Sequence, residues 1–351
     1  MSTSEVPSLG EEWPQKGLEE VERCPVCTER GRHLLHSGLS DLSYRSAPGR
    51  WQLFRCESCS CAYLDPRPDE QTAHLAYRNY YDGAAMRSVP PPRGWQRFRR
   101  ALRNGYLNAR YGYALAPSSA LGNIVLPLFP GHREKADEHV RHLSRRPGSP
   151  RLLDVGCGEG EFLTDMQALG WAGHGVDPSS EAVAIARARG LRVTEGAFPE
   201  VPLELGSFDA VTFRLVLEHI RDPVAAVQAC HRALKPRGIV WIATPSLDSE
   251  AHRLYGEHWI HLQPPRHAVV YSPASLTRLL TRSGFAVMSR KPSRHALWSF
   301  RLSAAMARGD APFAHSAPLS RSQTLRAHLA DLKALRDPGL ADVVVFIARK
   351  T

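Results

Sequence analysis

The run LLDVGCGEG, from Leu152 to Gly160, decides the expected fold. Its first half is apolar and is typical of a buried strand, whereas its second half has glycines at 156, 158 and 160. Glycine lets a backbone adopt a positive φ and pass close to a ligand, where a side chain would collide. The run therefore predicts a strand, a ligand-binding turn and a helix, in that order.

Apolar strands and amphipathic helices alternate after this run, and such alternation builds a parallel sheet covered by helices. The expected strands are 151–155, 173–176, 191–195, 208–213, 238–243, 285–288 and 342–348. Asp222 and Ser272 each stand before a proline, so each can cap a helix whose first position is that proline. We therefore expect an α/β domain over residues 151–351.

Two carboxylates point to the kind of ligand. Asp154 stands two residues before Gly156, and the glycine spacing is G-x-G-x-G, not the G-x-G-x-x-G of NAD-binding domains. This arrangement favours a ligand with a cationic amino-acid end. Asp177 ends the second expected strand, where its carboxylate can accept both ribose hydroxyl protons. Alternatively, Asp177 caps the helix that Pro178 and Ser179 begin.

Four sequence blocks resemble those of class I S-adenosylmethionine-dependent methyltransferases, which have a Rossmann-like sheet. The blocks are LLDVGCGEG, GVDPSSEAVAIAR, FDAVTFRLVLEHIRDP and ALKPRGIVWIATP, in the family's order. A fifth block, PPRHAVVYSPASLTRLLTRSGF, resembles a subgroup with an N-terminal zinc module, often found in polysaccharide or secondary-metabolite pathways. The resemblance spans residues 23 to 290 together with the closing strand, and it implies S-adenosyl-L-methionine as the cofactor.

The resemblance also implies where the cofactor binds. Gly156 and Gly158 would flank its methionine moiety with Cys157 between them, and Asp177, with Pro178 beside it, would hold its ribose. Similar enzymes use residues after the third strand to border the adenine.

At that third-strand position many relatives have an aspartate beside the adenine amine, whereas this chain reads Glu195-Gly196-Ala197-Phe198. Adenine recognition is therefore expected to use the backbone at Ala197 and the side chain of Phe198. Arg214 follows the fourth strand at a position that faces cofactor and substrate in similar enzymes. It either meets an anionic substrate or lies at the surface.

Methyl transfer from a sulfonium requires alignment, exclusion of water and, for weakly acidic hydroxyls, removal of a proton. His219 follows the fourth strand, where ligands bind in parallel sheets, and is a candidate base, with Glu218 a candidate to orient it. His219 could instead be a helix-end residue bonded to the backbone. His261 and His267 flank a loop that could cap the acceptor pocket, and His267 is a further catalytic candidate.

Two C-x-x-C pairs, Cys24 with Cys27 and Cys56 with Cys59, predict a tetrahedral zinc site within a module over residues 23–66. Four thiolates leave no open position for water, so the zinc would be structural. Cys61 could replace Cys59, or the thiols could be free. A nucleic-acid-binding zinc finger is also an alternative, but the module lacks a dense Lys/Arg face, so a nucleic-acid partner is disfavoured.

Residues 67–146 are expected to form a helical cap. The net charge is +10, and residues 83–133 contain eight Arg and no Asp or Glu. Apolar side chains within 93–113 follow a helical spacing, namely Trp95, Phe98, Leu102, Tyr106, Ala109 and Tyr113. This helix either covers the main domain as a lid or lies on an anionic membrane surface.

The first 22 residues are polar and aperiodic, so we expect them to be disordered. No apolar run approaches the roughly 18 to 20 residues that span a bilayer, and the N-terminus lacks the apolar core of a signal peptide. Paired cysteines without a disulfide framework also fit a reducing compartment, so a cytoplasmic location is expected.

Together, these patterns predict an S-adenosylmethionine-dependent methyltransferase acting on a small molecule such as a sugar, a glycan precursor or a secondary metabolite. Methylation of RNA or protein is the alternative that the basic segment favours. A non-catalytic binding protein with the same fold is the second. The acceptor atom, O, N or C, and the oligomeric state are left open.

Overall fold

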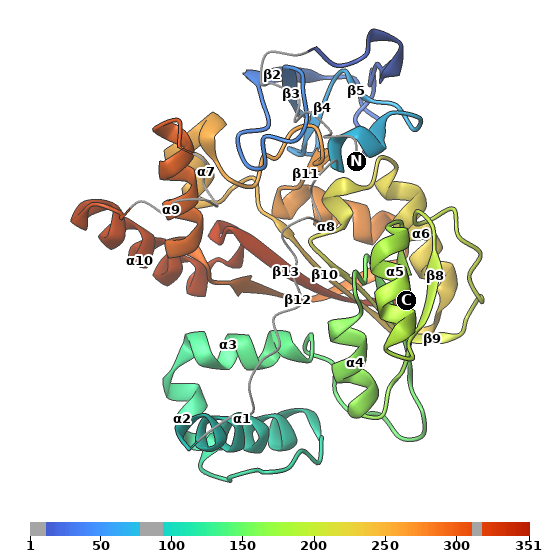
Figure 1. The fold of residues 1–351 in the computed structure, drawn as a ribbon, viewed down its shortest axis with the longest axis vertical. Coiled ribbons are helices and arrows are strands. Elements are labelled where there is room, and N and C mark those ends of the chain that lie inside the picture. Colours follow the sequence, from blue (N-terminus) through green and yellow to red (C-terminus); the bar gives the residue numbers. More distant parts are fainter. Residues whose placement is uncertain (1–11, 78–93, 311–317) are drawn as a thin grey trace, which may run out of the picture. The chain divides into compact units, whose positions relative to one another are not determined.

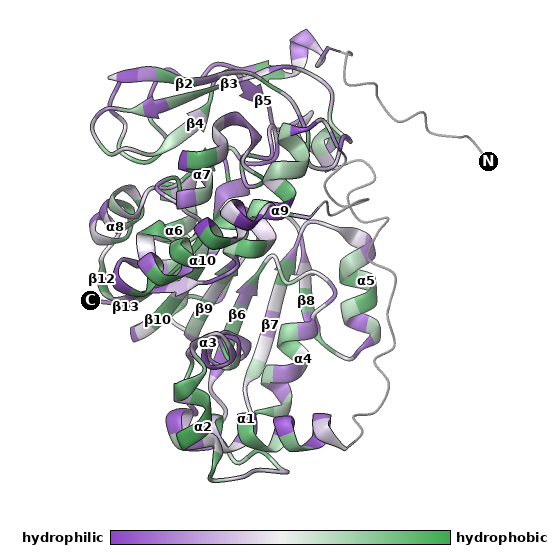
Figure 2. Ribbon diagram, turned by 90° about the vertical axis from the view of Figure 1, so that its left-hand side faces the viewer, coloured by the Kyte–Doolittle hydropathy of each residue, from purple (hydrophilic) through white to green (hydrophobic). Residues whose placement is uncertain are grey.

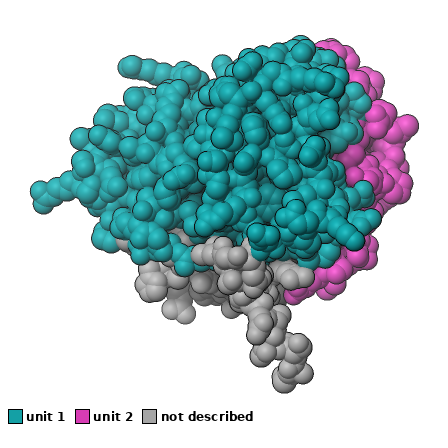
Figure 3. Space-filling model, turned by 90° about the horizontal axis from the view of Figure 1, so that it is seen from above, with its two compact units in different colours: residues 1–85, 215–228, 242–347 teal, residues 86–214, 229–241, 348–351 magenta. Residues whose placement is uncertain are grey.

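A computed structural model of the protein describes residues 12–77, 94–310 and 318–351 (Figure 1). Residues 1–11 of the expected leader and 78–93 of the expected cap lie outside the described residues. The chain divides into two compact units, each built from several segments (Figure 3). The first unit comprises residues 1–85, 215–228 and 242–347, and the second unit comprises 86–214, 229–241 and 348–351.

A seven-stranded sheet has the strand order β12-β13-β10-β9-β6-β7-β8. Its strands are β6 (Arg151–Val155), β7 (Ala172–Asp177), β8 (Arg192–Glu195), β9 (Phe208–Arg214), β10 (Leu234–Pro245), β12 (Phe285–Ser293) and β13 (Val343–Lys350). All seven expected strands are present, and the sheet fits the predicted Rossmann-like α/β class. Strands β10 and β12 are longer than their short apolar runs indicated, because polar residues continue the ladder at their ends.

The second unit holds the parallel part of this sheet. Strand β6 pairs in parallel with β7 and β9, and β7 pairs in parallel with β8. Helices α4 (Glu161–Ala168) and α5 (Ser180–Ala188) pack on these strands through one apolar cluster. Among its members are Leu152, Leu163, Met166, Val183 and Val193. The alternating pattern after residue 151 is therefore confirmed in this unit.

Three helices before β6 form a second cluster in the same unit. They are α1 (Trp95–Tyr111), α2 (Gly122–Leu128) and α3 (Pro130–His139). The hydroxyls of Tyr106 and Tyr111 both donate to Asp137 Oδ1, at 2.8 Å each. Figure 2 shows both hydrophilic and hydrophobic stretches on α1 and α2. The helical expectation is thus confirmed for 95–111, whereas its role as a lid stays a prediction.

In the first unit, a four-stranded antiparallel sheet carries the cysteine pairs. Its order is β11-β4-β3-β2, and its strands are β2 (Arg32–Leu39), β3 (Trp51–Cys56), β4 (Ala62–Leu64) and β11 (Val269–Val270). The WQLF run begins β3 as expected. Strand β11 pairs Val269 with Tyr63, so a segment far along the chain completes this sheet.

The predicted disorder of the leader is wrong for residues 12–22. Strand β1 (Leu18–Glu19) pairs with β5 (Arg67–Pro68), and the Val21 amide donates to Asp65 Oδ1 at 2.7 Å. Trp13 is buried, with its ring 5.3 Å edge-on from Trp51. A single tryptophan buries enough apolar area to order a short polar segment, which a composition argument overlooks.

The remaining helices include both predicted starts. They are α6 (Pro223–Ala233), α7 (Glu250–Tyr255), α8 (Pro273–Arg282), α9 (Ala296–Ala307) and α10 (Arg321–Arg336). Short 3-10 turns are η1 (Gln15–Gly17), η2 (Ala73–Tyr77), η3 (Leu217–His219), η4 (Gly256–His258) and η5 (Pro338–Leu340). Ser272 caps α8 and Asp222 accepts from the Ala225 amide, which confirms both caps. Within the described ranges, every helix is too short or too polar to cross a membrane.

Candidate functional site

The glycine turn after β6 has the backbone that its sequence predicts. Gly156, Gly158 and Gly160 all have positive φ, at 69°, 53° and 79°. At Gly160 an added Cβ would lie 2.2 Å from a Leu191 methyl carbon, so both conformation and space require glycine. The Gly156 amide donates to the Val176 carbonyl at 2.7 Å, which ties the turn to the end of β7.

Asp177, the last residue of β7, is buried and binds the same turn. Its Oδ2 accepts from the Gly158 amide at 2.8 Å, and its Oδ1 accepts from the Ser179 amide at 3.0 Å. Burial raises the pKa of this carboxyl, and the two amides oppose the rise. The cap of α5 is Ser179, whose hydroxyl accepts from the Ala182 amide. Asp177 therefore links the glycine turn to the end of β7, and the helix cap is a different residue.

Asp154 is also buried, and a cation already binds it. It pairs with the guanidinium of Arg141 and accepts from the Thr212 hydroxyl at 2.9 Å. Arg141 stacks on Phe162, 3.5 Å from the ring centroid, and has a left-handed backbone with φ at 47°. Burial lowers the pKa of Arg141, while Asp154 opposes that change. Asp154 was expected to bind a cationic group of the ligand, but in the structure its cationic partner is Arg141.

The other expected cofactor residues differ in exposure. Ala197, Pro178 and Arg214 are exposed, whereas Phe198 is buried with its ring 5.6 Å from that of Phe213. Phe198 therefore packs into the core of the second unit, and its role beside adenine stays a prediction.

Cys157 is buried inside the glycine turn, and burial raises the pKa of its thiol to about 12. The thiol is therefore neutral at physiological pH. Because carboxyl ends of parallel strands share one edge, the glycine turn, Asp177 and Arg214 all lie along the edge formed by β6, β7 and β9. The structure thus gathers these predicted cofactor residues at one edge of the second unit.

In the first unit, His219 ends the turn η3 and is held by main-chain and side-chain oxygens. Its Nδ1 lies 3.2 Å from the Arg266 carbonyl oxygen and 3.0 Å from the Tyr77 hydroxyl. Because a carbonyl oxygen can only accept, Nδ1 is assigned the proton and Nε2 keeps a lone pair. Burial lowers the pKa of His219 to about 4, and the charge of Arg266 adds to the effect. The imidazole is therefore neutral at pH 7.

Glu218, the neighbour of His219, is buried and bonds elsewhere. Its Oε2 accepts from the Thr244 hydroxyl at 3.0 Å, and its Oε1 has no hydrogen-bond partner within the described part of the chain. Burial raises the pKa of Glu218 to about 8, so the carboxyl is protonated at pH 7. Tyr77 and the Arg266 carbonyl orient His219, and no such contact with Glu218 is found among the residues that the structure describes.

His267 lies against His219, with the two ring centroids 4.6 Å apart and the rings nearly perpendicular. Its Nδ1 lies 2.7 Å from the His261 carbonyl oxygen, which assigns the proton to Nδ1 there as well. Burial lowers the pKa of His267 well below its usual value, with His219 the next cause. The segment expected to be a capping loop is itself mostly buried, and Arg266 is among its buried residues.

Arg266 is fully buried and forms an ion pair with Asp41. Both nitrogens of its guanidinium fork donate to this carboxylate, and Nη1 also donates to the Ala76 carbonyl at 3.1 Å. Although burial alone would raise the pKa of Asp41, the Arg266 guanidinium holds it below its usual value. Ser43 and Ser46 add hydroxyl bonds to the same carboxylate.

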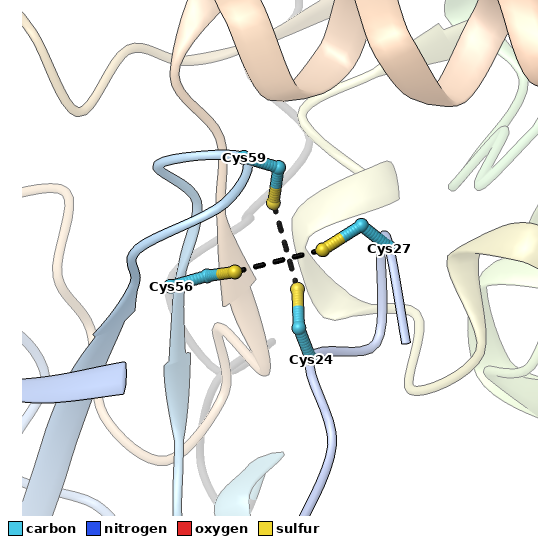
Figure 4. A group of neighbouring side chains, drawn as sticks. All are labelled: Cys24, Cys27, Cys56 and Cys59. Carbon is cyan, nitrogen blue, oxygen red and sulfur yellow. Dashed lines mark hydrogen bonds between the residues drawn. The ribbon is translucent and has the colours of Figure 1, made fainter. Parts of the chain in front are cut away.

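The four predicted cysteine ligands come together in the first unit (Figure 4). The sulfurs of Cys24 and Cys59 lie 3.5 Å apart, as do those of Cys27 and Cys56. All four are buried. In a tetrahedral site with Zn–S bonds of about 2.3 Å, two sulfurs are separated by only slightly more than these S–S distances. The donor set and its geometry therefore fit a four-coordinate zinc ion.

The two cysteine pairs sit in matching turns. The Cys24 carbonyl accepts from the Thr28 amide and the Cys56 carbonyl from the Ser60 amide. Both of these donors have left-handed backbones, at φ 66° and 64°. A fifth sulfur, Cys61, lies 3.3 Å from that of Cys24, so it packs against the cluster. Each turn is therefore formed by residues within five positions of one another, beginning at the first cysteine of its C-x-x-C pair.

Comparison with known proteins finds methyltransferases. A family model described as a methyltransferase domain matches residues 130–290. These residues, a little under half of the chain, are therefore similar to methyltransferase domains. Over 101 residues it is 40% identical to a ubiquinone biosynthesis O-methyltransferase of Xanthomonas oryzae, covering 27% of this chain and 42% of that protein.

A relative with the same description from Thiobacillus denitrificans is 33% identical over 151 residues, or 38% of this chain and 63% of the relative. The chain thus spans about half the length of these two relatives. A solved methyltransferase from Thermotoga maritima aligns with 65% of this chain and 95% of its own, at 22% identity and a TM-score of 0.42. A TM-score this low carries no weight for function.

Three contacts near the predicted sites were not found from the sequence. Arg141 pairs with Asp154, and Tyr77 and Arg266 hold His219. Arg141 lies thirteen residues before its partner, outside the glycine motif. The quoted block PPRH contains Arg266, so a signal for it was present, but its ion pair with Asp41 was not foreseen.

Replacing Glu218 by Gln tests the buried carboxyl beside His219. The pKa of about 8 in the folded protein lies above the 4.5 of a solvent-exposed glutamate, so the folded state stays protonated while the unfolded chain ionises. The wild-type protein therefore loses stability as pH rises from 4.5 to 8. We expect the difference in melting temperature, E218Q minus wild type, to become more positive as the pH rises from 5 to 8. A difference that does not change with pH would show that Glu218 is ionised in the folded protein.

Proposed function

We propose that the protein is an S-adenosylmethionine-dependent O-methyltransferase of a small molecule, such as a sugar, a glycan precursor or a secondary metabolite. The observation that carries this proposal is the carboxyl edge of β6, β7 and β9, where a glycine turn and a buried Asp177 adjoin. Relatives named as O-methyltransferases support a hydroxyl acceptor. When bound, S-adenosylmethionine supplies an electrophilic methyl group.

For the cofactor, we assign the ribose to Asp177 and the methionine end to the glycine turn. Each carboxylate oxygen of Asp177 accepts one amide hydrogen bond, so each keeps a lone pair for a ribose hydroxyl. The Asp154–Arg141 pair is buried and internally matched, so its proposed role is to support the strand that precedes the glycine turn.

For proton removal, we propose His219 as the general base. Its Nε2 keeps a lone pair, and its depressed pKa leaves it unprotonated at pH 7. His219 is five residues after Arg214, the last residue of β9. Tyr77 and the Arg266 carbonyl serve as positioning groups for the imidazole. His267 is proposed to contact the acceptor through its own Nε2.

For the cysteine cluster, we propose one structural zinc ion bound by Cys24, Cys27, Cys56 and Cys59. Four thiolates complete a tetrahedral shell, so the ion would have no position for water or substrate. The ion would hold the two C-x-x-C turns together and thereby stabilise the four-stranded sheet beside them. Reduced thiolates of this kind suit the cytoplasm.

Asp177→Ala tests the ribose assignment. We expect the dissociation constant for S-adenosylmethionine to rise at least tenfold, about 1.4 kcal/mol, because two hydroxyls lose their acceptor. Isothermal titration calorimetry measures this change, with the exposed Glu200→Ala as control. Unchanged affinity in the folded variant would remove Asp177 from the cofactor site.

His219→Ala tests the base. We expect turnover to fall by about a hundredfold or more, while cofactor affinity stays unchanged. Because burial lowers the pKa of His219 to about 4, the wild-type kcat/KM should persist to lower pH than an exposed histidine would allow. Exposed His328→Ala is the control. Normal turnover in H219A would exclude the role.

Elemental analysis tests the zinc site. We expect one zinc per chain in the wild type, and its loss in the double variant C24S/C27S. Cys61→Ser should retain the metal if Cys59 is the fourth ligand, and Cys230→Ser, a buried thiol outside the cluster, controls for loss of any thiol. Zinc lost from C61S but kept in C59S would assign the fourth position to Cys61.

A further inference from the structure

Helices α1 and α2 form a tightly packed antiparallel hairpin, here called the α1–α2 hairpin (residues 95–128). An added Cβ at Gly105 would lie 1.8 Å from the Ser119 carbonyl oxygen, and one at Gly122 would lie 1.9 Å from the Leu102 carbonyl oxygen. The two backbones are therefore in direct contact, which only glycine permits. The Ser119 amide also donates to the Ala101 carbonyl at 2.9 Å.

This packing sets the register of the hairpin. Residue 105 of α1 lies against 119 in the connecting segment, and residue 102 lies against 122 at the start of α2, so the returning chain runs antiparallel to α1. Continuing the register places the first turn of α1 beside the last turn of α2. The beginning of α1 and the end of α2 thus form one end of the hairpin.

That end is apolar and exposed. Trp95 and Leu128 are 69% and 71% exposed, and Phe98 and Phe129 are 44% and 55% exposed. The rings of Trp95 and Phe98 lie 5.4 Å apart. Leu121 and Ile124 continue the exposed apolar face along α2. Only the later half of the α1 stripe, including Leu102 and Tyr106, is buried against α2 and α3.

The same end is strongly basic. Arg97, Arg99 and Arg100 flank the exposed ring of Phe98 on α1, and all three are exposed. Residues 94–133 contain six Arg and no Asp or Glu. An apolar protein partner would leave these charges unmatched, whereas an anionic lipid surface accepts both the aromatic side chains and the charges.

We propose that this apolar, basic end of the α1–α2 hairpin docks on an anionic lipid bilayer. Trp95, Phe98, Leu128 and Phe129 enter the boundary between headgroups and acyl chains, and the arginines bind the lipid phosphates. Tryptophan and phenylalanine flanked by arginine suit this boundary, because the rings are apolar and the guanidinium groups stay hydrated. The glycine contacts keep the hairpin preformed, so docking orders no new segment.

Vesicle co-sedimentation of the full chain tests the proposal. We expect binding to phosphatidylcholine vesicles that contain phosphatidylglycerol, little binding to phosphatidylcholine alone, and weaker binding at high salt. The double variant W95S/F98S should lower the partition coefficient at least about tenfold, and R97Q/R99Q/R100Q should do the same. Leu205→Ser removes another exposed leucine of the second unit and is the matched control.

Three outcomes would overturn the proposal. The first is that the wild type does not bind anionic vesicles, or that W95S/F98S binds them as well as wild type does. The second is a dimer that W95S/F98S dissociates, measured by sedimentation velocity without lipid, which would make a second copy the occupant. The third is altered turnover in W95S/F98S with no vesicle binding in the wild type, which would make the hairpin a lid. Melting curves of the variants verify folding.

Discussion

The buried ion pair between Arg266 and Asp41 holds together the part of the first unit that contains the histidines. Its guanidinium binds a carboxylate that accepts from five further donors, and Nη1 also donates to the Ala76 carbonyl. Breaking a buried pair by removing one partner typically costs about 3–5 kcal/mol, because the other charge is left unpaired. The main-chain carbonyl of the same arginine holds His219. One residue therefore joins the N-terminal segment to the orientation of the candidate base.

The histidine cluster is built almost entirely from neutral groups. Glu218 is protonated at pH 7, and His219 and His267 are unprotonated, each because burial disfavours its charged form. Arg266, the nearest charge, is matched by Asp41. Little water screens the interactions of these buried groups, so the hydrogen bonds that hold them are stronger than they would be in water. This state follows from burial, which a sequence motif does not show.

Local patterns were predicted well, and contacts between distant segments were not. The glycine turn, the strand alternation, both helix caps and the cysteine pairs each depend on residues within a few positions of one another. Arg141, Tyr77 and the Arg266–Asp41 pair depend on segments that meet only after folding, at separations of up to 225 positions. Trp13 belongs to the same group, because one aromatic residue in a polar leader carries no periodic signal. The positions of ionisable groups were predictable, but their burial and protonation were not.

Strand β11 also bears on synthesis of the chain from its N-terminus. The four cysteines lie within residues 24–59, so a metal ion could bind them as soon as that segment leaves the ribosome. Strand β4 pairs with β3 at once, but its other edge waits for Val269 and Val270, more than two hundred residues later. Until then the nascent chain presents an open edge, the kind of surface that invites pairing with other chains. In this order of synthesis, metal binding at the four cysteines would precede closure of the β4 edge by β11.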